Sequence, residues 1–144
     1  MNVYIDTNIV VADSIANHPH KANALELFRK IRLSRWTPVI AAHGLAEFFS
    51  VLTRAPFQPR ITSTEAWHSL EQNVLSSYEI LALSRADYSE ALRQCAAHGW
   101  SGGIVFDALH LQAARKANCG RIYTLNVDHF RRIAPDLRDR IVAP

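Results

Sequence analysis

The chain has 144 residues, a length that fits one domain whose core can bury about two-thirds of the unfolded surface. Hydrophobic residues make up 49% of it and charged residues 20%, which is ordinary for a soluble globular protein. No apolar run approaches the roughly 20 residues that cross a bilayer, and the N-terminus lacks the basic region of a signal peptide. We therefore expect a single domain over residues 1–144, in the cytoplasm and without a membrane partner.

The basic residues indicate a polyanionic substrate. The net charge is only +3, but thirteen of the sixteen basic residues are arginine, whose planar side chain pairs well with phosphate. A coding sequence rich in G and C explains this bias equally well. The candidates for phosphate contact are Arg54, Arg60, Arg131 and Arg132.

The two cysteines have no pattern of their own. Cys95 and Cys119 lack both the paired spacing of a zinc site and the density of a disulfide scaffold. We expect both to be free and buried.

Apolar periodicity and turn residues predict alternating strands and helices. In chain order they are a strand at 3–5, a helix at 22–33, a strand at 39–41, a helix at 45–52, a loop at 55–64, a helix from 65 to 75, a strand at 80–83, a helix opened by Ser84 or Asp87, a helix at 104–118, a strand at 122–125 and a short helix at 129–133. Ser63 or Thr64 is expected to cap the helix after the loop, and Gly120 to occupy the C-terminal cap of the helix at 104–118. Short strands alternating with longer helices predict an α/β fold, a three-layer α/β/α sandwich around a parallel sheet.

Two acidic residues lie where such a fold places its sites. Open parallel sheets bind ligands at the carboxyl ends of their strands. Asp6 follows the first predicted strand directly, and Asp128 comes a few residues after the fourth. Both are candidates for a site at that edge.

Two further acidic residues lie on helices inside apolar stretches. Glu47 is flanked by Leu45, Ala46 and two phenylalanines, and Asp107 follows Ile104, Val105 and Phe106. A carboxylate in such a setting points to solvent, pairs with a base or binds a cation, because burying it alone is costly. A contact of His43 with Glu47, one helical turn away, is a plausible link.

Converging carboxylates suit Mg²⁺ or Mn²⁺, which prefer hard oxygen ligands. The histidines do not supply the spacing of a catalytic zinc site, and neither a nucleotide phosphate loop nor a serine hydrolase elbow is present. Acids grouped around a metal repel one another, so at least one should have a raised pKa when the metal is absent.

Four motifs in order resemble those of PIN-domain nucleases. They are Tyr4-Ile5-Asp6-Thr7-Asn8, Ala46-Glu47-Phe48, Phe106-Asp107-Ala108-Leu109 with Ala113-Ala114 downstream, and Tyr123-Thr124-Leu125-Asn126 with Phe130 beyond. They cover nearly the whole chain, which is also similar in length to the toxin subunits of bacterial toxin–antitoxin pairs of the VapC type.

The resemblance implies an α/β/α fold with a sheet that usually has five strands, one more than the pattern predicts. It also implies a Mg²⁺- or Mn²⁺-dependent endoribonuclease that hydrolyses RNA, forms a homodimer and is inhibited by a cognate antitoxin protein.

The resemblance also implies roles for individual residues. Asp6 and Asp107 match the principal metal ligands and Glu47 the second acid, while Thr7 and Asn8 match positions that shape the site through hydrogen bonds.

The last motif departs from the common pattern. Many relatives have an acid two residues after the threonine, where this chain has Asn126. Asp128 follows two residues later, and His129 stands where another acid often precedes the phenylalanine. Either Asn126 or Asp128 could be the fourth site residue, beside Asp6, Glu47 and Asp107.

Three other interpretations remain open. The chain could be a PIN nuclease of RNA processing or DNA repair, or a non-catalytic PIN domain that only binds a partner. A phosphatase of the haloacid dehalogenase type is the third, but it normally has a second aspartate where this chain has Asn8.

Overall fold

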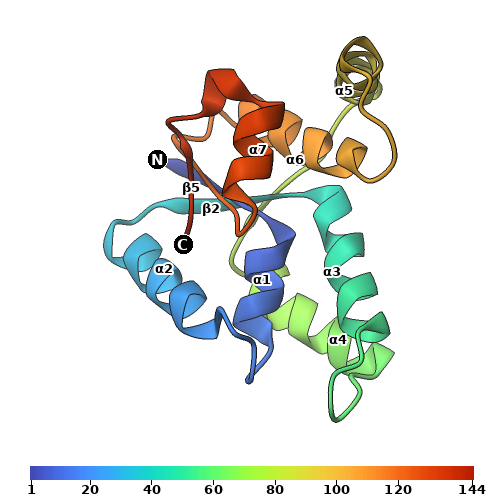
Figure 1. Ribbon diagram of the computed structural model, residues 1–144. Coiled ribbons are helices and arrows are strands. Elements are labelled where there is room, and N and C mark those ends of the chain that lie inside the picture. Colours follow the sequence, from blue (N-terminus) through green and yellow to red (C-terminus); the bar gives the residue numbers. More distant parts are fainter.

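The computed structural model describes all residues, 1–144, and contains one five-stranded sheet (Figure 1). The strands are β1 (Asn2–Ile5), β2 (Thr37–Ala41), β3 (Glu79–Leu81), β4 (Arg121–Tyr123) and β5 (Ile141–Val142). Their order is β3-β2-β1-β4-β5, and every neighbouring pair is parallel. The predicted α/β fold is confirmed, and so is the fifth strand that the family resemblance implied.

Helices cover both faces of the sheet (Figure 1). They are α1 (Thr7–Ser14), α2 (Lys21–Leu33), α3 (Ala42–Arg54), α4 (Ser63–Leu70), α5 (Arg85–His98), α6 (Ile104–Lys116) and α7 (Val127–Ile133), with a π-helical turn at Glu71–Leu75 after α4 and a 3₁₀ turn at Pro135–Leu137. None of these helices has the length and apolar character needed to cross a membrane.

Alternation along the strands divides the core into two layers, because successive strand side chains point to opposite faces. Val3 and Ile5 of β1 pack in a cluster with α1, α2, α3 and α4. Tyr4, between them, packs on the other face with residues of α6 and α7. These two layers and the sheet between them form the expected α/β/α sandwich.

Several local expectations were wrong. Thr62, one residue before the predicted pair, caps α4 and forms a reciprocal capping box with Glu65. Helix α6 ends at Lys116, and the left-handed residue after it is Asn118 (φ 48°), not Gly120. Gly120 instead lies against Met1, where a Cβ atom would collide with the methionine side chain.

The sheet order defines the edge at which a site can form. From β1 the chain moves to β2 and β3 on one side and later returns to β4 on the other. The crevice at the carboxyl end of β1 is therefore the point at which strand order reverses, where open parallel sheets bind ligands.

Candidate active site

Asp6 lies at this point, between β1 and α1. Asp6 is only 4% exposed, and its carboxylate accepts a hydrogen bond of 2.7 Å from Thr124 Oγ1. Thr124 lies just beyond β4, and its hydroxyl also accepts from the Asn126 backbone amide at 3.0 Å. The end of the neighbouring strand thus holds the Asp6 carboxylate in place.

A pocket of about 370 Å³ opens above these strand ends. Its lining includes the three acids Asp6, Glu47 and Asp107, which come from the end of β1, from α3 and from α6. Thr7, Asn8 and Asn126 also line it. The structure therefore gathers six of the seven predicted site residues around one cavity.

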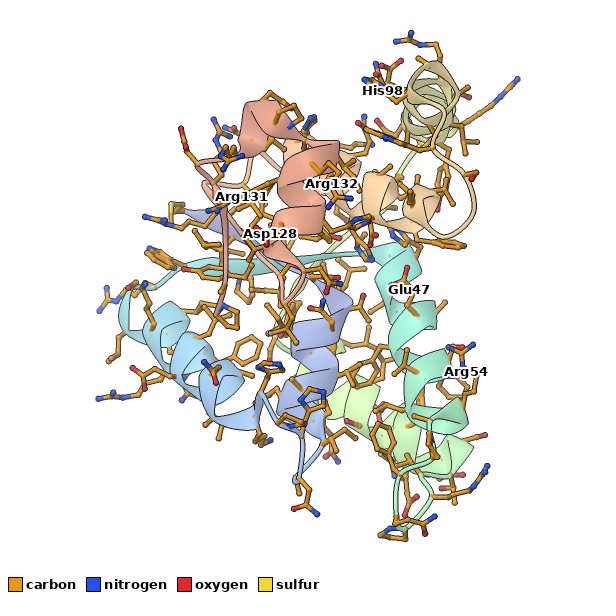
Figure 2. All side chains as sticks on the ribbon, viewed as in Figure 1. Glu47, Arg54, His98, Asp128, Arg131 and Arg132 are labelled. Atoms are coloured by element: carbon orange, nitrogen blue, oxygen red, sulfur yellow. The ribbon has the colours of Figure 1, made fainter.

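Asp128 is the exception. It lies in the first turn of α7, is exposed and does not line the pocket (Figure 2). Asn126, the other candidate for the fourth position, faces the pocket from the loop before α7.

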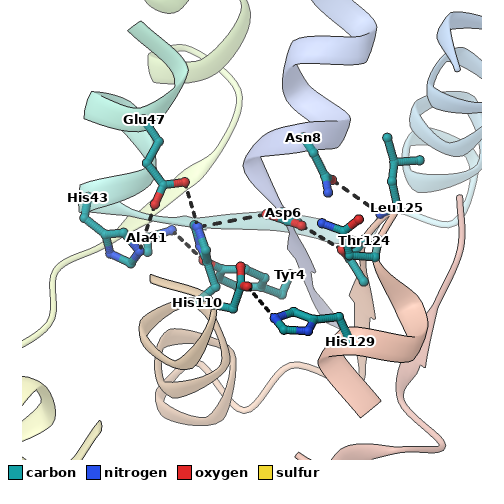
Figure 3. Close-up of polar contacts among 12 residues, drawn as sticks. Tyr4, Asp6, Asn8, Ala41, His43, Glu47, His110, Thr124, Leu125 and His129 are labelled. Atoms are coloured by element: carbon teal, nitrogen blue, oxygen red, sulfur yellow. Dashed lines mark hydrogen bonds and ion pairs between the residues drawn. The ribbon is translucent and has the colours of Figure 1, made fainter. Parts of the chain in front are cut away.

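His110 is the central residue that the sequence analysis did not single out. It is 1% exposed, its Nε2 lies 2.9 Å from Glu47 Oε2 and 3.9 Å from Asp6 Oδ1, and its Nδ1 lies 2.6 Å from the Tyr4 hydroxyl (Figure 3). The signal available in the sequence was spacing, because His110 follows Asp107 by three residues and therefore shares its helical face.

Two more histidines contact the acids. His129 Nε2 lies 2.9 Å from Asp107 Oδ2. The histidine that stands where many relatives have an acid therefore pairs with an acid of the pocket. His43 Nε2 lies 3.9 Å from Glu47 Oε1, an ion-pair distance but not a hydrogen bond. The expected link between His43 and Glu47 is thus a close approach without a bond.

The grouped acids have unequal proton affinities. Burial raises the pKa of Asp6 above its ordinary value, and the charges of Asp107 and Glu47 add to the increase, although His110 and Thr124 oppose it. Burial also raises the pKa of Asp107 against the opposing effect of His129. The expected rise in pKa is therefore present at Asp6 and Asp107, although burial contributes more to it than the repulsion between acids on which the prediction rested.

Glu47 and His110 form an ion pair that shifts both groups toward their charged forms. Burial alone would raise the pKa of Glu47, but the hydrogen bond and charge of His110 lower it below its ordinary value. Burial alone would lower the pKa of His110, but its bond to Glu47 and the nearby acids raise it. His43 has no such bond, and its pKa falls to about 4 because of burial and the charge of His110.

The donor set fits a hard divalent cation. Carboxylate oxygens of Asp6, Glu47 and Asp107 and the side chain of Asn126 surround one open cavity, and Glu47 Oε1 is buried without a hydrogen-bond partner. Oxygen ligands of this kind suit Mg²⁺ and Mn²⁺. A cation would also stabilise the charged form of Asp6, whose pKa is raised chiefly by burial and further by the neighbouring acids.

Comparisons with known proteins identify the family of the chain. The family model of the PIN domain matches residues 3–135, and the chain therefore belongs to the PIN-domain family. Within that family it groups with the VapC proteins. Ribonuclease VapC40 of Mycobacterium tuberculosis is 34% identical to it over 105 residues, which is 72% of each chain.

Solved structures share the fold. VapC20 of Mycobacterium tuberculosis, described as a toxin that cleaves the sarcin–ricin loop, has a TM-score of 0.69 at 16% identity and covers 88% of this chain and 92% of its own. VapBC2 of Rickettsia felis, solved with a DNA fragment from its promoter, has a TM-score of 0.65 at 23% identity, with coverage of 100% and 98%.

Proposed function

We propose that the protein is a metal-dependent endoribonuclease and the toxin of a toxin–antitoxin pair. The observation that carries this proposal is the convergence of Asp6, Glu47 and Asp107 on one pocket at the switch point of the sheet. Kinship with a VapC ribonuclease supports the activity and its RNA substrate. We take residues 1–144 as its single catalytic domain.

Asp6 and Asp107 are the proposed ligands of Mg²⁺ or Mn²⁺, with Glu47 as the second acid. When bound, such an ion activates water and stabilises charge on the leaving oxygen of a phosphodiester. Thr124 fixes the Asp6 carboxylate by its hydrogen bond, and His110 fixes that of Glu47. These residues position and neutralise charge, so no nucleophilic side chain is required.

For the fourth position we propose Asn126 rather than Asp128, because Asn126 lines the pocket and Asp128 does not. Asn126→Ala should therefore lower cleavage much more than Asp128→Ala. Equal losses in the two variants would contradict this assignment.

A groove beside the pocket offers a path for the RNA backbone. It has a volume of about 470 Å³, shares Glu47 and Val51 with the pocket and extends along α3 to Arg54. Arg54 lies seven residues after Glu47 on the same helix, and Figure 2 shows the two side chains along its length. Arg54 is therefore the arginine best placed for phosphate contact.

The partners are proposed from the same kinship. Among the structural relatives, VapBC2 of Rickettsia felis and VapBC-1 of nontypeable Haemophilus influenzae are toxin–antitoxin assemblies. A cognate antitoxin that covers the pocket, and a homodimer of this chain, are the corresponding expectations here.

The proposal is tested by expressing the wild type and Asp6→Ala, followed by mapping of new RNA 5′ ends. We expect growth arrest and new ends only with the wild type, and relief by the product of a small neighbouring gene. Cleavage by the purified wild type should require Mg²⁺ or Mn²⁺ and stop with excess chelator. Cleavage without growth arrest would favour a PIN nuclease of RNA processing, and intact cleavage by Asp6→Ala would refute the site.

A further inference from the structure

A second group of side chains that could hold a metal ion adjoins the pocket, and two of its three members, Glu47 and His110, also line it. His43, Glu47 and His110 each present a ligand atom, and these atoms all lie within 4.8 Å of one another (Figure 3). His43 and Glu47 are one turn apart on α3, and His110 faces them from α6. His43 does not line the carboxylate pocket, so this group extends away from the proposed catalytic centre.

The group contains polar atoms that lack partners. Both ring nitrogens of His43 and Glu47 Oε1 are buried and make no hydrogen bond. Most buried polar atoms in proteins have a partner, and a structural histidine usually bonds through at least one nitrogen. Two of these atoms, His43 Nε2 and Glu47 Oε1, lie 3.9 Å apart and could share one ligand.

The spacing is close to that of a zinc site. Bonds of about 2.0–2.1 Å in a tetrahedral site put ligand atoms roughly 3.3 Å apart. Here His110 Nε2 lies 2.9 Å from Glu47 Oε2, and His43 Nε2 lies 3.9 Å from Glu47 Oε1. Because all three ligand atoms lie within 4.8 Å of one another, shifts of at most about 1.5 Å would bring every pair to this spacing.

His110 is already oriented for this role. Its Nδ1 contacts the Tyr4 hydroxyl at 2.6 Å, and the Ala41 amide donates a hydrogen bond of 3.3 Å to the same hydroxyl. A histidine that binds metal through one nitrogen is normally held by a hydrogen bond at the other, which fixes its ring. The Tyr4 contact leaves Nε2 directed at Glu47.

We propose that His43 Nε2, the Glu47 carboxylate and His110 Nε2 form a Zn²⁺ site with water in the fourth position. Two histidines and one glutamate are a known ligand set for an open zinc site. Imidazole ligands favour Zn²⁺ strongly over Mg²⁺, which prefers oxygen. The site is thus distinct in metal preference from the carboxylate pocket beside it.

Glu47 belongs to both groups, and this has a regulatory consequence. Zn²⁺ bound by His43, Glu47 and His110 would engage the Glu47 carboxylate that the proposed catalytic centre also uses, so it should inhibit Mg²⁺-dependent cleavage. This consequence rests on the proposed function, whereas binding of Zn²⁺ does not.

Binding is tested by calorimetric titration of Zn²⁺ into the full chain in excess Mg²⁺, with the wild type, His43→Gln and His129→Gln. His129→Gln is the matched control, because it removes an imidazole that contacts Asp107 on the other side of the pocket. Loss of a positioning partner weakens metal binding roughly 10- to 100-fold, so loss of the ligand His43 should weaken it by about 100-fold or more. The control should bind like the wild type.

X-ray absorption at the zinc edge gives a second readout, with two imidazoles expected in the wild type and fewer in His43→Gln. An all-oxygen zinc shell in the wild type, or equal losses of affinity in the two variants, would overturn the proposal. Melting curves show whether each variant is folded. If His43→Gln does not fold, Tyr4→Phe takes its place, and its affinity for Zn²⁺ should fall roughly 10- to 100-fold.

Cleavage assays test the regulatory role. His43→Gln should cleave RNA with Mg²⁺ and should not be inhibited by Zn²⁺, and inhibition of this variant by Zn²⁺ would refute the regulatory role.

Discussion

Removal of the charge of Asp6 should stabilise the protein when no metal is bound. In Asp6→Asn the side-chain oxygen can still accept the hydrogen bond from Thr124, while a buried charge that is repelled by Asp107 and Glu47 disappears. Each unit by which the folded state raises a carboxyl pKa costs about 1.4 kcal/mol at neutral pH. Since 1 kcal/mol changes Tm by roughly 2–4 °C at this chain length, an increase of a few degrees is expected.

The pH dependence follows from the same shift. The pKa of Asp6 is raised in the folded state, so its cost is absent below the unfolded value of about 3.9 and grows as pH rises through the folded value. The difference in Tm between Asp6→Asn and the wild type should therefore be largest near neutral pH and vanish in acid.

Mn²⁺ should reverse the order of stability. At a concentration of 100 times Kd a ligand adds about 2.7 kcal/mol, which corresponds to roughly 5–11 °C in Tm. The wild type should gain this stability and Asp6→Asn should not, so the two melting temperatures cross as Mn²⁺ is added. The reasoning would be refuted if the wild type were more stable than Asp6→Asn without metal, or if Mn²⁺ raised the Tm of both proteins equally.

Other substitutions test the stability of the fold, both at the site and away from it. Tyr4→Phe leaves the buried His110 nitrogen and a backbone amide unpaired, so it should lower the free energy of unfolding by about 1–3 kcal/mol, and an unchanged urea midpoint would contradict this. Thr62→Ala breaks the capping box with Glu65 far from the pocket, and should cost about 0.5–2 kcal/mol without reducing cleavage per folded molecule. Phe48→Ala removes a fully buried ring from the core and should cost about 3–5 kcal/mol, which urea unfolding would measure.

The sheet could be predicted because its strands carry strong local signals. Strand β1 is a short apolar run that ends at a polar residue, and this places Asp6 at a strand end without any tertiary information. Strand β5 is only two residues long, Ile141–Val142, so no periodicity can reveal it. Its pairing with β4 depends on the fold of the preceding chain.

Asp107 was predicted as a site residue partly from its apolar neighbours, and these do not explain its position in the structure. Its apolar flanks indicated burial, yet Phe106 is 53% exposed and Asp107 itself is only half-buried. What places Asp107 at the pocket is the start of α6, at Ile104, together with its contact to His129. Both are properties of the folded chain.

Spacing in the sequence could place His110 on the helical face of Asp107, but it could not reveal the contacts of His110, because its partners are distant in sequence. Tyr4 and Glu47, which hold its two ring nitrogens, are 106 and 63 residues away. In the helical pattern His110 stands between Leu109 and Leu111 as one more buried position. Only the tertiary structure shows that it lies among the acids.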